Sequence, residues 1–86
     1  MNKHILMVID YQLNPDKYTQ QELDKNSDYA YASATFATSA TSAYAAYAAY
    51  TASVDADDAY WFNEYFKLSG ENKQDYIDAI NKDNKQ

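Results

Sequence analysis

The sequence predicts a mainly α-helical chain with one N-terminal β-strand, a single small domain over residues 1–86 that associates with copies of itself. Residues 3–13 alternate between apolar and other side chains with the period of a strand. Residues 19–68 contain neither glycine nor proline and follow a helix-capping pattern. We therefore expect a strand, then a long Ala/Tyr-rich helix or a helical hairpin over 19–68, and a short C-terminal helix over 72–82.

The strand assignment rests on the stretch KHILMVIDYQL. Its alternate positions place five apolar side chains on one face: Ile5, Met7, Ile9, Tyr11 and Leu13. Asn14-Pro15-Asp16 supplies turn residues that end it. A lone strand leaves unpaired edges, so we expect it to pair with its copy in a second protomer; the alternatives are an arm docked on the helices or a strand added to a partner's sheet.

The helical region begins at a capping box, in which Thr19 and Glu22 satisfy each other's backbone amides. One helix from residue 19 to 68 would be about 75 Å long at 1.5 Å per residue. A monomer could not cover such a helix, so either partner helices lie beside it or it breaks. Two breaks are plausible on sequence, near 26–28 (Asn-Ser-Asp) or near 53–55, where Ser53 precedes several aspartates as a helix cap would. Gly70 suits the helix end, and Asn72 suits the cap of the last helix.

The charge excludes several partners. Thirteen acidic residues against seven lysines give a net charge of −6, and arginine is absent. Arginine is the usual reader of phosphates and bases, so we expect no direct nucleic-acid binding. An acidic chain is repelled by anionic lipid and attracted to basic protein surfaces. Cysteine is absent, and the apolar run Ile5–Ile9 is too short for a secretory signal, so we expect a cytoplasmic protein.

No catalytic or cofactor-binding set is visible in the sequence. His4 is the single histidine and has no evident nucleophile partner. The aspartates after Ser53 lack the glycine of a calcium-binding loop, and Gly70, the single glycine, cannot form a phosphate-binding loop. We expect no enzymatic activity, no metal and no cofactor.

Residues 29–54 carry no charge and repeat tyrosine every third residue in AYAAYAAY. The segment holds many Ser and Thr and no Leu or Ile, so we do not expect it to span a membrane. Small residues let helices approach closely while tyrosines fill the gaps. We expect a homo-oligomer seam made by Phe36, Tyr44, Tyr47 and Val54, with a second contact surface at Tyr31 and Tyr50, which lie off the main stripe.

Residues 55–66 concentrate the acidity and mix it with aromatic side chains, without a single lysine. Aromatic anchors ringed by carboxylates suit a basic groove on another protein. The expected partner-binding residues are four acids and five aromatics: Asp55, Asp57, Asp58, Glu64, Tyr60, Trp61, Phe62, Tyr65 and Phe66.

The stretches AYAAYAAY and YWFNEYFKLSGENKQDY, in a small acidic chain, resemble in general character the short acidic accessory proteins of tailed bacteriophages, which often antagonise host or defence factors. The resemblance implies a protein in the host cytoplasm that sequesters or inhibits a larger protein. Two alternatives stay open: a DNA mimic that occupies a basic cleft, and a structural homo-oligomer of a virion or scaffold.

Overall fold

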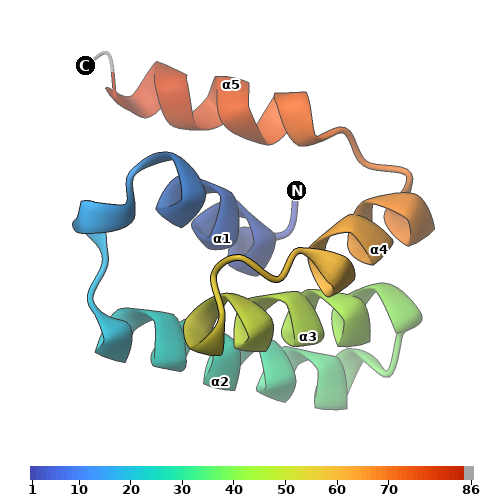
Figure 1. Cartoon of the computed structure of the whole chain (residues 1–86). Helices are drawn as coiled ribbons and strands as arrows, with labels where there is room; N and C mark the ends of the chain where they lie inside the picture. Colours follow the sequence, from blue (N-terminus) through green and yellow to red (C-terminus); the bar gives the residue numbers. More distant parts are fainter. Residues whose placement is uncertain (85–86) are drawn as a thin grey trace.

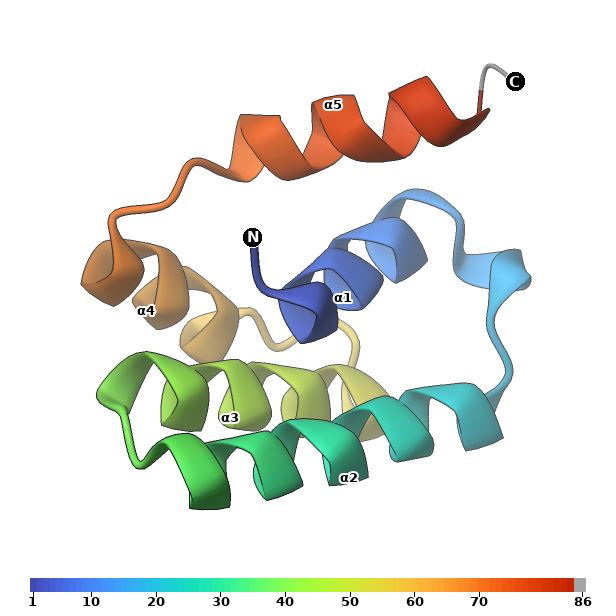
Figure 2. The same cartoon turned by 180° about the vertical axis from the view of Figure 1, so that it is seen from behind.

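The computed structural model describes residues 1–84, and this part of the chain contains five α-helices and no strand (Figure 1). The elements are α1 (Lys3–Leu13), a short 3-10 turn (Pro15–Lys17), α2 (Gln20–Ala37), α3 (Ala40–Val54), α4 (Tyr60–Ser69) and α5 (Lys73–Asn84). Figures 1 and 2 show α2 and α3 running side by side, with α4 turning back along α3. Helix α1 lies between this layer and α5. The helical character expected from the sequence is therefore confirmed.

The predicted N-terminal strand is wrong, because residues 3–13 form helix α1. Asn2 caps this helix through Oδ1, which accepts from the amides of His4 at 2.9 Å and Ile5 at 3.2 Å. The continuous apolar run fits the helical spacing i, i+3, i+4 as well as it fits alternation, and the helix buries Ile5, Val8 and Ile9 along one face. Burial between two helical layers thus outweighs the strand preference of these residues. The argument for an oligomer based on strand pairing falls with the strand.

The helical region 19–68 is divided into three helices rather than two. Of the two break positions considered, residues 26–28 lie inside α2, whereas α3 ends at Val54, within 53–55. Helix α2 ends at Thr38, which takes the left-handed conformation with φ 51°. Ser39 then caps α3, its Oγ accepting from the Ser42 amide at 3.2 Å. Ser53 does not cap a helix, since it lies inside α3 and donates to the Tyr50 carbonyl. The turn between α2 and α3 contains neither glycine nor proline, so no residue in the sequence marks the position of this hairpin.

The hairpin of α2 and α3 packs through alanine. Ala30 of α2 and four alanines of α3 are buried (Ala45, Ala46, Ala48 and Ala49). Because alanine ends at Cβ, the helix backbones can approach closely, and α3 can be buried on two sides by α2 and α4. The larger core side chains come from the other helices: Ile5, Val8 and Ile9 of α1, Phe62 and Tyr65 of α4, and Tyr76 and Ile80 of α5.

The α4–α5 connection follows the expected chemistry. Gly70 takes the left-handed conformation (φ 72°) that ends α4, and Asn72 Oδ1 accepts from the Gln74 amide at the start of α5. Glu71, between them, accepts from the hydroxyls of Tyr65, at 2.8 Å, and Tyr76. The Asn2 amide donates to the Tyr76 hydroxyl at 2.9 Å. This shared network, the Glu71 cluster, ties the N-terminus and α5 to α4.

A candidate protein-interaction surface

Six aromatic rings from three helices form a continuous group at the surface, which we call the aromatic ridge: Tyr31 of α2, Tyr44, Tyr47 and Tyr50 of α3, and Tyr60 and Trp61 of α4. Tyr47 is at its centre, with ring centroids 6.2 Å from Tyr31, 6.3 Å from Tyr44 and 4.7 Å from Trp61. Tyr50 and Tyr60 extend the group at 6.4 Å from Tyr31 and 5.0 Å from Trp61.

The ridge is open to solvent. The exposed fractions are 40% for Tyr31, 51% for Tyr50 and 59% for Tyr60, whereas Trp61 is half-buried. Partial burial and the neighbouring Tyr47 and Tyr50 raise the pKa of Tyr31. Aromatic groups of this size are normally covered, and contiguous exposed ones mark interaction sites.

The acidic turn, residues 55–58, borders the ridge. Its backbone closes with the Asp58 amide donating to the Asp55 carbonyl at 3.1 Å, and the Asp58 carboxylate accepts from the Tyr60 amide at 3.1 Å. Tyr50 and the exposed Val54 lie one helical turn apart on α3 and lead into Asp55. All three aspartates are exposed, and none pairs with a lysine among residues 1–84. The ridge therefore ends at uncompensated negative charge.

The structure divides the residues expected to bind a partner. Asp55, Asp57, Asp58 and Tyr60 are exposed and Trp61 is half-buried at the ridge. Phe62 and Tyr65, however, are buried at 5% and 2% exposure, and Phe66 packs against the core. Glu64 is half-buried and reaches Lys67 at 3.4 Å. Helix α4 is amphipathic, so its aromatic run could not all face outward.

The residues expected in an oligomer seam are also divided. Tyr44 and Tyr47 belong to the aromatic ridge, Val54 lies beside it, and Phe36 is 89% exposed near the α2–α3 turn. The ridge therefore combines half of the expected seam with part of the expected partner site. Tyr31 and Tyr50 complete the ridge: they were expected on a second contact surface, but Tyr31 lies against both Tyr47 and Tyr50, so they share one surface with the seam tyrosines.

His4 is not an isolated surface histidine. It is 6% exposed, its Nδ1 lies 3.1 Å from Asn26 Oδ1, and its Nε2 lies 3.4 Å from Ser33 Oγ. Asn26 Nδ2 donates to the His4 carbonyl, which leaves Oδ1 to accept from the ring N–H. The chain of contacts from Asn26 through His4 to Ser33 resembles a catalytic triad with a serine nucleophile. Ser33, however, lies in the middle of α2, where the backbone amides are hydrogen-bonded within the helix and cannot form an oxyanion hole. The group supports a structural role, joining α1 to α2.

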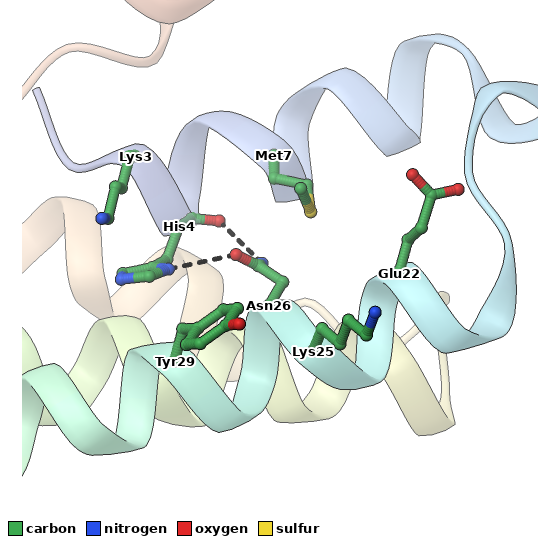
Figure 3. Close-up of a pocket in the computed structure, with 7 residues that line it drawn as sticks. All are labelled: Lys3, His4, Met7, Glu22, Lys25, Asn26 and Tyr29. Atoms are coloured by element: carbon green, nitrogen blue, oxygen red, sulfur yellow. Dashed lines mark hydrogen bonds between the residues drawn. The ribbon is translucent and has the colours of Figure 1, made fainter.

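A shallow groove of about 480 Å³ lies over this group, between α1 and α2 (Figure 3). Its lining is mixed in charge and character: Lys3, His4, Met7, Glu22, Lys25, Asn26 and Tyr29. The Glu22 carboxylate is already used by the capping box with Thr19, which the structure confirms. The groove brings together no acid–base pair, and residues 1–84 contain no cluster of three His, Asp or Glu side chains arranged for a metal.

Asp10 is a buried carboxylate whose oxygens are all engaged in hydrogen bonds near the end of α1. It accepts from Lys17 at 2.6 Å, Tyr18 at 2.5 Å and Asn14 at 2.9 Å. Burial raises the pKa of Asp10, but these three hydrogen bonds and the Lys17 charge outweigh burial and hold the pKa below its usual value. Burial, the hydrogen bond to Asp10 and the negative charges of Asp10 and Glu22 raise the pKa of Tyr18. The cluster fixes the turn after α1 and leaves no free acid or base.

Within the part of the chain that the structure describes, no helix is both long and apolar enough to cross a membrane. Comparison of the chain with protein-family models, curated proteins and solved structures returns no match.

Proposed function

We propose that this chain is a non-enzymatic protein-binding module that sequesters or inhibits a larger protein by placing its aromatic ridge and acidic turn on a basic surface. The observation that carries the proposal is the six-ring ridge, four of whose rings are exposed, ending at three exposed aspartates that pair with no lysine among residues 1–84. Aromatic side chains supply most of the binding energy at protein interfaces, and adjacent charge selects the partner and speeds its association.

The resemblance to phage accessory proteins supports a host or defence factor as the partner. The DNA-mimic alternative draws less support, because residues 29–54 present an uncharged face where a mimic needs distributed carboxylates. A homo-oligomer would use the same ridge, and the test below therefore includes the mass of the free protein.

The test compares capture of proteins from a host lysate by the immobilised chain and by matched variants. The ridge variant is Tyr50→Ser with Tyr60→Ser, and its control is Tyr29→Ser, an equally exposed tyrosine (65%) in the α1–α2 groove. The charge variant changes Asp55, Asp57 and Asp58 to Asn, and its control changes Asp28, Asp75 and Asp78 to Asn. Asparagine retains the acceptor that bonds the Tyr60 amide.

The proposal expects a basic partner that is retained by the wild type and both controls and is lost from both test variants. Equal retention by all five proteins would contradict it. Suppose that light scattering shows the wild type to be a dimer and the ridge variant a monomer, and that the lysate yields no partner protein. The ridge is then an interface between copies of this chain, and the proposal is wrong.

A further inference from the structure

The proposal above leaves open what the ridge recognises, and the geometry points to a basic, proline-rich segment of the partner in the polyproline II conformation. This inference rests on the proposed function, since it names the partner class for the same surface.

The ridge matches such a segment in hydrogen-bonding character. It offers five phenol hydroxyls and one indole N–H. None of these six groups makes a hydrogen bond within residues 1–84. Tyr31, Tyr47, Tyr50 and Tyr60 are exposed, and the polar atoms of the half-buried Tyr44 and Trp61 are not buried without a partner, so the donors are available at the surface. A polyproline II chain makes no internal hydrogen bonds and leaves its carbonyl oxygens free to accept. In an α-helical ligand the backbone carbonyl oxygens already accept hydrogen bonds within the helix, so tyrosine hydroxyls would find few free acceptors on it.

The ring geometry also fits proline side chains. Tyr31 and Tyr47 are inclined at 63°, Tyr31 and Tyr50 at 74°, and Tyr44 and Trp61 at 73°. Inclined rings present edges and faces in alternation, which gives a corrugated surface rather than a flat stacking platform. Pyrrolidine rings dock between such aromatic side chains in known proline-rich recognition.

The spacing along α3 matches the ligand's repeat. Tyr44, Tyr47 and Tyr50 follow each other at intervals of three residues. At 1.5 Å per residue, Tyr44 and Tyr50 are separated by about 9 Å along the helix axis. A polyproline II helix rises about 3.1 Å per residue and repeats every three residues, which is again about 9 Å. Six residues turn an α-helix by about 600°, so Tyr44 and Tyr50 also point about 120° apart, and prolines three apart in a ligand would meet the ridge at this spacing but on two different sides of it.

The acidic turn favours a ligand with positive charge. Asp58 lies directly beside Tyr60, and residues 55–66 carry four acids and no cation. A lysine or arginine flanking the prolines would reach these carboxylates while the prolines lie on the rings. An acidic proline-rich segment would be repelled at the same place.

Trp61 is the single tryptophan, so its fluorescence reports ligand binding at the ridge directly. The probe is a peptide of eight prolines with a lysine at each end. It is compared with a peptide in which glycine and serine replace the prolines and with one in which glutamate replaces the lysines. We expect the Lys–Pro peptide to bind at least about tenfold more tightly than either comparison peptide, and its binding to weaken with salt. The Tyr50→Ser/Tyr60→Ser variant should lose this binding, and Tyr29→Ser should keep it.

Equal affinity for the Lys–Pro and Gly/Ser peptides, or no change in Trp61 emission with the Lys–Pro peptide at millimolar concentration, would overturn the inference. If that happens while the lysate partner is still lost from the ridge variant, the proline-rich class is wrong and the proposed function stands. If the ridge variant retains every lysate partner as well, both fall.

Discussion

Trp61 of α4 lies against Tyr47 of α3, with ring centroids 4.7 Å apart and planes inclined at 55°. The contact joins a residue expected in the partner-binding site to a residue expected in an oligomer seam. It also shows that Trp61 and Tyr47 are part of the α3–α4 packing, so these two rings at the centre of the ridge are held in place before any partner arrives. Such preorganisation lowers the entropic cost of binding.

The Trp61–Tyr47 contact should contribute to stability. A double-mutant cycle with Trp61→Ala and Tyr47→Ala, followed by circular dichroism in urea, should give a coupling free energy of about 0.5–1.5 kcal/mol. As a control, Trp61→Ala and Tyr29→Ala should be additive within about 0.5 kcal/mol, because Tyr29 lines the groove between α1 and α2. If the effects of Trp61→Ala and Tyr47→Ala on the free energy of unfolding are additive, the contact between the two rings does not contribute to stability.

The hydrogen bonds that Asp10 accepts should make the free energy of unfolding depend on pH in the acidic range. Asp10→Asn removes the charged acceptor of Lys17 and Tyr18 and should lower the free energy of unfolding by about 1.5–3 kcal/mol at neutral pH. Because the folded pKa of Asp10 lies below its ordinary value of 3.8, the carboxylate stabilises the fold above that value and loses this contribution as pH falls through the folded pKa. The difference between wild type and Asp10→Asn should therefore shrink on acidification. The exposed Asp16→Asn variant should show little difference at any pH.

The Glu71 cluster should behave as a unit. Tyr76→Phe keeps the ring but removes the hydroxyl that contacts Glu71 and the Asn2 amide, and should cost about 1–2 kcal/mol. Tyr65→Phe removes the second donor to Glu71, and the double variant should deviate from additivity by at least about 0.5 kcal/mol. Hydrogen exchange at the Asn2 amide should accelerate in Tyr76→Phe. Unchanged exchange would show that this amide is protected by something else.

The two left-handed residues should respond in opposite directions to substitution. Thr38 adopts φ 51° with a β-branched side chain, and the Thr38→Gly variant should gain about 0.5–1 kcal/mol by relieving that conformation. Gly70 has φ 72° and open space where a Cβ would lie, so Gly70→Ala should lose about 1 kcal/mol from backbone conformation alone. Thermal unfolding checks both variants. Destabilisation by Thr38→Gly would mean that the Thr38 hydroxyl bond to Ala37 matters more than the strain.

The sequence predicted the helical character and the local helix signals better than it predicted the first helix. Thr19 with Glu22, Gly70 and Asn72 act as expected because capping depends on neighbours in the chain. Residues 3–13 were misassigned because a short continuous apolar run satisfies both periods. What decides between them is the burial of Ile5, Val8 and Ile9 between α5 and the α2–α3 layer, and no local pattern contains that contact.

The candidate surface was predictable only in part, for the same reason. The acidic turn and Tyr60 follow from local sequence, but which aromatics of α4 face outward depends on where α3 lies. Phe62 and Tyr65 were therefore assigned to the surface although they fill the core. The association of Tyr31, Tyr47 and Trp61 needs three helices in place, and it could be seen only in the fold.

The most direct test of the central claim is an NMR map of the captured partner's binding site on this chain. Trp61 gives a single indole N–H signal, which can be followed as the partner is added. The account predicts large shifts at that signal and at the amides of Tyr31, Tyr47, Tyr50 and Asp58, with little change at Lys3 and Lys25 in the α1–α2 groove. Shifts confined to that groove, with an unmoved indole signal, would contradict the account.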